Sequence, residues 1–465
     1  MKLPPLKGFC KKSAATIPLH IITLDEQKNF LKTQTPATQK IATQRQWHKA
    51  GDCLFIHDTK GALESIAVLC APPITLYALA HVPDFITAHC DPSIIKRGFH
   101  IIAPRIKDED LNNVYSAWAL AHYNFDAFKK SKLIKPLLAC PPAKLKTIKA
   151  QIEAIYFVRD LINMPPNKLG PAELAAAALS LAKNHKAKSK VIKDKKLETE
   201  FPLIHEVGKG SDRKPCLVDF TWGNPKHKKI TIVGKGIIFD TGGYDIKPSA
   251  AMLLMKKDMG GAAMALGLAH LIMAHKLPVR LRVLIPIAEN SISGNAYRPS
   301  DILTSRNGVS IEIGNTDAEG RLVMADCLAV ASEENPALLI DFSTLTGAAR
   351  SALGFDLPAL FSNDDSIAQT LQHISMACDD PLWHMPLWRG YKKDILSPVA
   401  DINNAGNNPA GAVTAALFLD HFVDAKTKWI HIDHYAWEQT GRAGRPRGGT
   451  DMGMRAVFQF IENLK

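Results

Sequence analysis

The chain has 465 residues, more than the roughly 250 to 300 beyond which one hydrophobic core usually stops growing, so two domains are expected. Hydrophobic residues make up 46% of the chain and charged residues 22%, a composition that argues against a disordered or fibrous protein. The formal net charge of +12 leaves nucleic acid, an anionic membrane or an acidic substrate open as partners, although the Lys and Arg residues are scattered.

The N-terminal end of the chain, residues 1–15, reads MKLPPLKGFCKKSAA, and Pro and Lys interrupt its apolar residues. It therefore lacks the continuous apolar segment of a secretory signal. The eight cysteines form no Cys-x-x-Cys pair and have no regular spacing, which argues against a zinc ribbon and a disulfide framework. Free thiols are typical of a reducing compartment, so we predict a cytoplasmic protein.

The first elements in chain order are two short apolar runs, residues 17–24 and 53–56, which have the length and composition of strands. A helical pattern follows at residues 112–128. Together these elements predict a small N-terminal α/β domain over residues 1–142. No motif with an evident chemical role stands out in it.

A change of composition at residues 141–142, both Pro, marks the expected domain boundary. The chain becomes basic and polar there, and a long helical pattern then runs over residues 144–162 and ends at Asn-Met-Pro-Pro. We expect residues 143–163 to form a connecting helix and residues 164–465 to form the second domain. The densest run of positive charge, residues 183–196, lies between apolar segments, and a solvated face is a better interpretation of it than a binding patch.

The second domain shows a repeated order of elements. From Ile230 onward, the chain passes again and again from an apolar strand through a Gly-rich or polar loop into a helix. This order predicts a mostly parallel central sheet covered by helices, and such sheets bind ligands beyond the carboxyl ends of their strands. The candidate strands are residues 230–233, 279–288, 338–342 and 429–433, and the candidate helices are residues 260–274, 321–333 and 411–423.

The longest nearly apolar run is residues 262–274, which includes His270. A membrane-spanning helix needs about 20 apolar residues, so this run is too short to be one. We interpret it as a buried helix of the second domain and expect no membrane partner.

Two segments of the second domain place polar side chains beside glycines. The first is VGKGIIFDTGG, with Lys235 and Asp240, followed by Lys247. It matches neither of the common phosphate-binding loop motifs, and on its own it indicates a turn with a salt bridge more often than a site. In the second, MKKDMGG, Asp258 precedes an apolar helix, and helix capping is its simplest interpretation.

The third segment, NTDAEGR at residues 315–321, follows an alternating strand and precedes a helix. Thr316 and Glu319 have the spacing of a capping box. A cap does not explain why Asp317 and Arg321 are also present. In an extended loop, alternate residues point the same way, so Asp317, Glu319 and Arg321 would face one cavity.

If the three segments meet beyond the strand ends, they bring four carboxylates and three cations together. Crowded carboxylates cannot all ionise unless cations offset their repulsion. Hard divalent metals such as Mg, Mn or Zn suit such oxygen-rich sites, and two ions about 3.5 to 4 Å apart can share carboxylates. The chain has no HExxH motif, which leaves the common single-zinc peptidase site unsupported. The residues that would converge are Asp240, Asp258, Asp317, Glu319, Lys235, Lys247 and Arg321.

These segments resemble the two-metal leucine aminopeptidases. NTDAEGRL, residues 315–322, is similar to the signature of that family, and the other blocks agree in order and spacing. The similarity covers residues 150–465, whereas the N-terminal part resembles the family only in its length and one helix. The other blocks are VGKGIIFDTGG, IKPS, MKKDMGGAA, SGNAYRPSD, STLTGA, RDLINMPPNKLGPAELA and NPAGAVTAALFL.

The resemblance implies two divalent metal ions in each subunit, Zn or Mn, with Mg or Co as alternatives. It implies that Asp240 and Glu319 bridge the two ions. A lysine ligand must lose its proton, which two adjacent cations make plausible. One ion would be held by Lys235, Asp240, Asp258 and Glu319, and the other by Asp240, Asp317 and Glu319.

The resemblance also implies an aminopeptidase that removes the first residue, Leu or another apolar residue, from peptides with a free N-terminus. A hydroxide bridging the metals would attack the scissile carbonyl, Lys247 would polarise that carbonyl, and Arg321 would hold a bicarbonate ion acting as general base. A homohexamer is implied as well. For Met255 and Leu345, core packing is weighed equally with substrate contact. The family builds its substrate cleft at the positions of Met255, Asn315, Thr344, Leu345 and Gly347.

Three alternatives accompany this interpretation. A nucleic-acid-binding protein of the same fold, with secondary or no peptidase activity, is consistent with the basic balance, although nothing else supports DNA as a partner. A phosphoryl-transfer enzyme could use the Gly-rich loops and the metals. His431, Asp433 and His434 could mimic metal ligands near the C-terminus, but a strand end with hydrogen-bonded imidazoles is the preferred interpretation.

Overall fold

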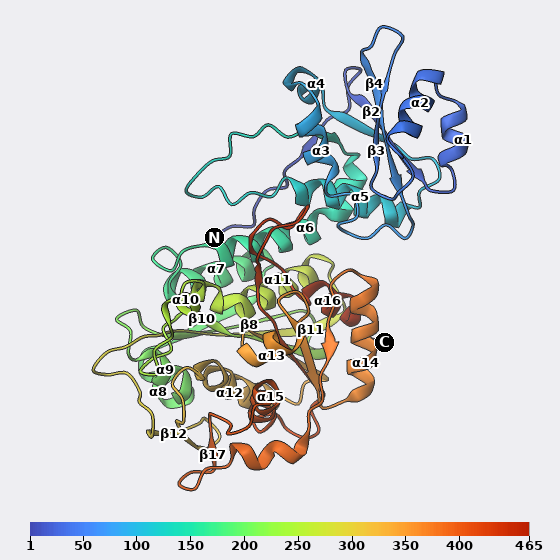
Figure 1. Cartoon of the computed structure of the whole chain (residues 1–465). Helices are drawn as coiled ribbons and strands as arrows, with labels where there is room; N and C mark the ends of the chain where they lie inside the picture. The colour runs from blue at the N-terminus through green and yellow to red at the C-terminus, as the bar shows by residue number, and fades with distance from the viewer. Residues whose placement is uncertain (465) are drawn as a thin grey trace. The chain divides into compact units, whose positions relative to one another are not determined.

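The computed structural model describes residues 1–464 and divides into two compact units (Figure 1). The smaller unit comprises Pro4–Glu153 and Thr440–Arg447, and the larger unit comprises Met1–Leu3, Ala154–Gln439 and the residues from Gly448 onward. The helix α6, Pro142–Asn163, begins in the smaller unit and ends in the larger one. The domain boundary near residue 142 stays a prediction.

The smaller unit is built on one six-stranded sheet, whose order is β1-β6-β5-β2-β4-β3. All neighbouring strands are parallel except β3 and β4, which form an antiparallel pair. Apolar side chains fill both faces of the sheet and form two separate core clusters. The strands are β1 Phe9–Cys10, β2 Ile17–Thr23, β3 Cys53–His57, β4 Leu63–Cys70, β5 Phe99–Ile102 and β6 Leu138–Ala139.

One helix of the smaller unit differs from its prediction. The pattern at residues 112–128 predicts a helix that ends at Phe128, whereas α5 spans Asp108–Ala121. The helix closes with a tight bond from the His122 amide to the Ala119 carbonyl (2.8 Å). Phe128, at the end of the predicted helix, is 59% exposed and is therefore not part of a buried face. The other helices are α1 Gln27–Lys32, α2 Pro36–Gln44, α3 Val82–His89 and α4 Pro92–Arg97.

The larger unit contains a nine-stranded sheet, whose order is β16-β15-β18-β14-β9-β11-β8-β7, with β10 pairing with β11. The central strands β18, β14, β9 and β11 are parallel, which confirms the prediction of a mostly parallel sheet. Antiparallel pairs at β8, β7 and β15 flank this centre. The strands are β7 Lys188–Ile192, β8 Cys216–Trp222, β9 Lys228–Gly234, β10 Gly236–Asp240, β11 Val279–Asn290, β14 Leu338–Ser343, β15 Ala359–Ser362, β16 Trp383–His384 and β18 Trp429–Asp433.

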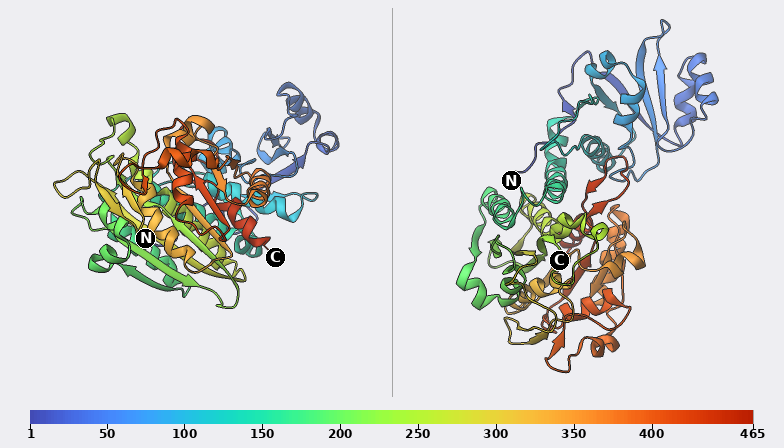
Figure 2. Two further views of the ribbon diagram at one scale, coloured as in Figure 1. Left: turned by 90° about the horizontal axis from the view of Figure 1, so that it is seen from below. Right: turned by 60° about the vertical axis from the view of Figure 1, so that its left-hand side comes forward.

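Helices cover both faces of this sheet and make a three-layered unit, as Figures 1 and 2 show. The helices α7, α11 and α16 lie on one face, and α9, α12 and α15 lie on the other. The larger unit's helices are α7 Pro171–Asn184, α8 Asp194–Glu200, α9 Pro202–Gly208, α10 Ser249–Met252, η1 Met255–Met259, α11 Gly260–Ala274, α12 Glu319–Ser332, α13 Gly347–Leu353, α14 Asp365–Ala377, η2 Arg389–Ile395, α15 Gly411–Asp420 and α16 Met454–Glu462. Its short strands are β12 Ile302–Thr304, β13 Ser310–Glu312, β17 Ile402–Asn403, β19 Trp437–Glu438 and β20 Gly448–Gly449.

The helix α11 explains why the chain's most apolar run carries no helical periodicity. It is buried from Gly260 to Met273 because it packs against the sheet on one side and against α16 on another. A helix enclosed in this way is apolar all round. Within residues 1–464, no helix combines the length and the apolar character needed to cross a membrane.

Candidate active site and metal centre

The parallel strands β9, β10, β14 and β18 end at the same edge of the larger unit's sheet. Each strand delivers a polar side chain to that edge. Asp240 and Asp433 are the last residues of β10 and β18, while Lys235 and Thr344 directly follow β9 and β14. The short helix η1 adds Asp258. The carboxyl edge of the sheet therefore gathers charged groups that are far apart in the sequence.

Lys235 lies in the middle of this group and is 2% exposed. Its Nζ is 2.8 Å from Asp258 Oδ2 and 2.9 Å from Glu319 Oε1, and it donates a hydrogen bond to the Thr344 carbonyl oxygen (3.1 Å). The side chain runs over Gly320, where a Cβ atom would stand only 2.6 Å from Nζ. Glycine at this position therefore makes room for the buried lysine.

Lys247 forms a second ion-paired centre beside the first. Its Nζ is 2.8 Å from Asp240 Oδ2 and also contacts Asp317 Oδ1. The other oxygen of Asp240 accepts hydrogen bonds from the Gly242 amide (2.9 Å) and from Asn290 Nδ2 (2.8 Å). Asp240 is thus held in place by backbone and side-chain donors while one oxygen faces the lysine.

The acidic side chains of three segments meet between the two lysines. Asp240, Asp317 and Glu319 each offer a carboxylate oxygen, and these oxygens lie within 4.8 Å of one another. Asp258 is held nearby because its Oδ1 accepts a hydrogen bond from Thr344 Oγ1 (2.6 Å). The predicted convergence of the four carboxylates with Lys235 and Lys247 is therefore present.

Burial and the crowding of like charges shift the pKa values of these groups. Burial, and next the neighbouring Asp240 carboxylate, raises the pKa of Glu319 to about 8 and that of Asp317 to about 6. Burial lowers the pKa of Lys235 and of Lys247, but the surrounding carboxylates outweigh it and leave both values above the ordinary lysine range. The cluster therefore retains positive charge in its midst.

Two simpler interpretations of the acidic segments are wrong. Asp258 does not cap α11, because the N-cap residue is Met259 and no side chain caps that helix. Thr316 and Glu319 form no capping box, since α12 starts from Ala318 without a side-chain cap. Thr316 Oγ1 instead donates to the Gly242 carbonyl oxygen (2.7 Å) and ties the third segment to the first.

The expectation of an extended loop is wrong for Glu319 and Arg321, because both lie in the first turn of α12. Residues two apart on a helix point in different directions. Arg321 is buried, its Nη1 donates to the Asn404 carbonyl oxygen (2.6 Å), and its guanidinium lies 5.9 Å from the ring centre of Phe418. Asp317 alone keeps the loop position that the pattern predicts.

Three residues that support the site were not predicted. Asn404 joins the third segment to the loop before α15, with its Nδ2 donating to the Asn315 carbonyl oxygen (2.7 Å). Asn290 and Tyr297 both donate to the Thr316 carbonyl oxygen, at 3.0 and 2.6 Å. Asn290 and Asn404 lie outside the blocks that resemble the family, and Tyr297 lies within SGNAYRPSD, to which no role was assigned.

The five expected cleft residues lie around the same edge. Thr344 is buried against Asp258, and Asn315 Oδ1 accepts a hydrogen bond from the Asp317 amide (2.7 Å). Met255 is half-buried at the start of η1. Leu345 is half-buried and packs against the main core cluster, and Gly347 is exposed at the start of α13.

The sequence predicts hydrogen-bonded imidazoles for His431 and His434, and only the first of these predictions is confirmed. His431 is hydrogen-bonded, with Nδ1 2.6 Å from Asp341 Oδ1, whereas neither ring nitrogen of His434 has a hydrogen-bond partner among residues 1–464. Burial, followed by the nearby Lys257 charge, lowers the pKa of His434 to about 3, so the ring is neutral. Neither histidine belongs to the carboxylate cluster that could hold a metal.

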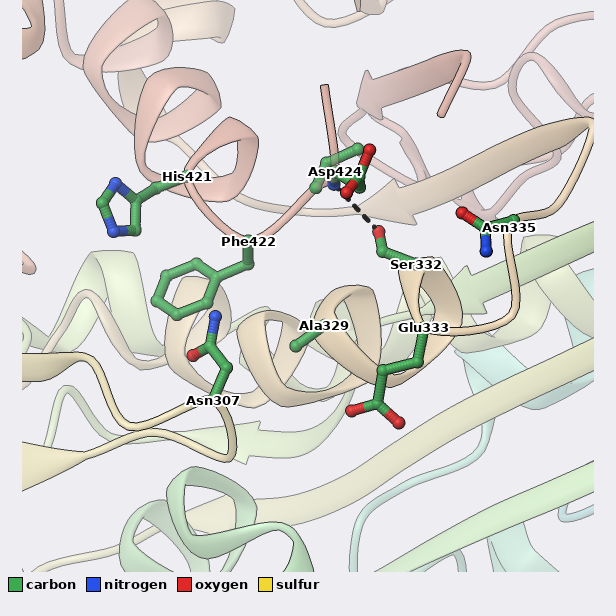
Figure 3. Close-up of a pocket in the computed structure, with 9 residues that line it drawn as sticks. Asn307, Ala329, Ser332, Glu333, Asn335, His421, Phe422 and Asp424 are labelled. Carbon is green, nitrogen blue, oxygen red and sulfur yellow. Dashed lines mark hydrogen bonds between the residues drawn. The ribbon is translucent and has the colours of Figure 1, made fainter. Parts of the chain in front are cut away.

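A hollow of about 380 Å³ lies at the opposite end of α12, shown in Figure 3. Ser332 and Asp424 line it and are joined by a hydrogen bond from the Asp424 amide to Ser332 Oγ (3.2 Å). The 14 residues of α12 separate this hollow from Glu319 by about 20 Å. Concave shape and clustered charge therefore occur at different ends of the same helix.

Comparisons with known proteins show which family the chain resembles over most of its length. The model of the cytosol aminopeptidase family, catalytic domain, matches residues 156–458, and that of the M17 aminopeptidase N-terminal domain matches residues 17–141. A probable cytosol aminopeptidase of Syntrophotalea carbinolica is 40% identical over 363 residues, covering 74% of this chain and 73% of that protein.

Solved structures show the same likeness in three dimensions. The cytosol aminopeptidase of Coxiella burnetii is 44% identical with a TM-score of 0.90, covering 97% of this chain and 98% of that one. The bottromycin maturation enzyme BotP, solved in complex with Mn, is 29% identical with a TM-score of 0.83, covering 97% of this chain and 99% of that one. The resemblance inferred from the motifs is confirmed, and the chain belongs to the cytosol aminopeptidase family of metal-dependent aminopeptidases.

Proposed function

We propose that the chain removes the first residue, leucine or another apolar residue, from peptides with a free N-terminus, using two divalent metal ions at the acidic cluster. The observation that carries this proposal is the meeting of the Asp240, Asp317 and Glu319 oxygens within 4.8 Å of one another. The proposed ligands of one ion are Lys235, Asp240, Asp258 and Glu319, and those of the other are Asp240, Asp317 and Glu319.

The side chains at the cluster fit hard divalent ions. Asp258 Oδ2 and Glu319 Oε1 are buried, and the Lys235 ammonium lies 2.8 and 2.9 Å from them. Each carboxylate oxygen has more than one acceptor position, so both oxygens can also bind a metal. Zn and Mn are the proposed ions, with Mg and Co as alternatives, and the Mn complex of BotP supports Mn.

When bound, the two ions would supply Lewis acidity and would activate water as a nucleophile at neutral pH. Lys235 must give up its proton to act as a ligand, so we expect proton release on metal binding. The α-amine of the peptide is proposed to bind at the same cluster, which fixes the N-terminus beside the scissile bond and limits the reaction to the first residue.

Lys247 is proposed to stabilise the negative charge that develops on the scissile carbonyl oxygen. Its pKa lies above the ordinary value because the Asp240 and Glu319 carboxylates outweigh the effect of burial. The side chain therefore keeps its proton at neutral pH, and a charged ammonium can donate to an oxyanion but cannot act as a base.

Arg321 is proposed to hold a bicarbonate ion that acts as the general base. Burial lowers the pKa of Arg321 to about 10, so the guanidinium stays charged at neutral pH and cannot itself accept a proton. Its Nε is buried and donates no hydrogen bond in the described part of the chain. A charged donor in this position is suited to a small anion.

The substrate cleft is proposed to lie along Met255, Asn315, Thr344, Leu345 and Gly347. The half-buried side chains of Met255 and Leu345 can contact an apolar first residue, which supports the proposed preference. By family membership we further propose a cytoplasmic homohexamer, with a domain boundary near residue 142.

A panel of amino-acid amides, assayed after metal removal and after readdition of Zn, Mn, Co or Mg, tests the proposal. We expect no hydrolysis without metal, recovery with at least one ion, and the highest kcat/KM for leucine or another apolar residue. Protein that stays inert with every ion would refute the proposed reaction.

A further inference from the structure

A second group of cations lies next to the proposed cleft and takes no part in the reaction described so far. Lys257 Nζ is 4.6 Å from the ring centre of Tyr435, and the guanidinium carbon of Arg350 is 5.0 Å from the same centre. Phe355 packs on Tyr435 with its ring 4.8 Å away and is 48% exposed. Two positive charges thus share one aromatic ring at the edge of the sheet.

The carboxylate in this group is already satisfied. Asp433 Oδ1 accepts hydrogen bonds from the Leu345 amide (2.8 Å) and the Thr346 amide (3.3 Å), and its Oδ2 accepts one from Thr346 Oγ1 (2.6 Å). Arg350 forms no ion pair within residues 1–464, and its one hydrogen bond there goes to the Thr346 carbonyl oxygen (3.2 Å). The guanidinium therefore keeps most of its donors for another partner.

The chain leads directly from the proposed metal ligands to this arginine. Thr344 contacts Asp258 and Lys235, and α13 begins three residues later at Gly347 and carries Arg350. A Cβ atom at Gly347 would stand 3.4 Å from Arg350 Nη2. Because Gly347 is exposed and has no side chain, that face of the guanidinium is left open beside the cleft.

The space beside the arginine is suited to a small polar group. Arg350, Phe355, Asp433, His434 and Tyr435 border a hollow of about 10 Å³, which has room for one water-sized group. A carboxylate oxygen fits that size, and a guanidinium is the side chain that binds carboxylates in a bidentate manner. Since the proposed cleft takes an apolar first residue, a substrate carboxylate here must belong to a later residue.

We propose that Arg350 determines substrate specificity by binding a carboxylate of the peptide on the far side of the scissile bond. The carboxylate is either the C-terminus of a short peptide or an acidic side chain. This inference rests on the proposed aminopeptidase function. It makes short free-acid peptides and peptides with an acidic second residue better substrates than their neutral counterparts.

Two substrate pairs separate the two sources of the carboxylate. Leu-Gly against Leu-Gly-amide tests the C-terminus, and Leu-Asp-amide against Leu-Asn-amide tests the side chain. In the wild-type holoenzyme, we expect kcat/KM to favour the charged member of at least one pair about tenfold, mainly through KM. In Arg350→Gln, that ratio is expected to fall to about one, while Arg298→Gln, a change at an exposed arginine elsewhere, keeps it.

Wild-type ratios near one for both pairs would overturn the inference, as would an Arg350→Gln variant that keeps the wild-type ratio. If that variant does not fold, the wild-type ratios alone still decide. An enzyme that cleaves neutral peptides without this discrimination refutes only the role of Arg350. An enzyme that cleaves no peptide refutes the proposed function itself.

Discussion

The two units share an architecture but differ at the carboxyl edges of their sheets. Both consist of mainly parallel strands covered by helices. At that edge of the smaller unit, Glu26 pairs with Arg105 (2.9 Å), whose side chain is 73% exposed. At the same edge of the larger unit, Lys235 has a side chain that is 3% exposed and pairs with two buried carboxylates.

This difference shows that a shared architecture does not determine the chemistry of a site. The architecture brings the strand ends together, and the residues in and beyond the loops determine which charged groups meet there. In the smaller unit, the arginine of the ion pair is largely exposed, so water screens the interaction. In the larger unit, burial raises the pKa of Glu319, and neighbouring lysines offset the crowded acids. In this arrangement, the Asp240, Asp317 and Glu319 carboxylate oxygens lie within 4.8 Å of one another.

The substitution with the largest expected effect is Glu319→Gln at the buried edge. It removes a carboxylate that we propose both ions share, so kcat/KM for a leucyl reporter is expected to fall by more than about 10³-fold. Circular dichroism should remain that of the wild type. The matched control is Glu333→Gln, at the other end of α12, where an exposed pair with Arg306 is lost and activity should stay within about twofold. Equal activity in both variants would mean that the Glu319 end of α12 is no more important for the reaction than the Glu333 end.

Lys247→Ala should have the next largest effect. Its loss removes one donor from the developing oxyanion, and such donors typically contribute about 10² to 10³ in rate. The decrease is expected in kcat, with the fold retained by circular dichroism. Lys226→Ala, in an exposed turn, is the control and should leave kcat unaltered. A Lys247→Ala variant with wild-type kcat would contradict the proposed role.

Much of the larger unit's core could be predicted because its central strands are buried on both faces. The runs at β9, β14 and β18 are nearly continuous in apolar residues, and such runs are typical of parallel strands. Strand β8 lies before Ile230, where the predicted series of strands begins, and it carries Asp219 within its apolar run. In the structure, that carboxylate pairs with Arg282 of β11 (2.9 Å), a partner 63 residues away that local periodicity does not reveal.

The charged part of the site could be predicted for a similar geometric reason. Parallel strands end at one edge, so Asp240 and the residues after β9 and β14 had to meet there. The direction in which each side chain points could not be predicted in the same way. Glu319 and Arg321 lie on a helix rather than an extended loop, and Asn404 reaches the site from a distant loop. Such pairings depend on tertiary contacts and leave no regular spacing in the sequence.

The smallest effect is expected from Glu26→Gln, at the edge of the smaller unit that corresponds to the active edge of the larger one. Glu26 pairs with the exposed Arg105 and accepts a hydrogen bond from Thr23 Oγ1 (3.0 Å). An exposed pair of this kind contributes about 0.2 to 1 kcal/mol, so chemical denaturation should show a decrease in unfolding free energy within that range. The kcat/KM for a leucyl reporter should stay within about twofold of the wild type, because the substitution leaves the acidic cluster intact. A tenfold loss of activity with an unaltered fold would mean that the edge of the smaller unit takes part in the reaction. In that case, burial of the charged groups would not be what distinguishes the active edge of the larger unit from the edge of the smaller one.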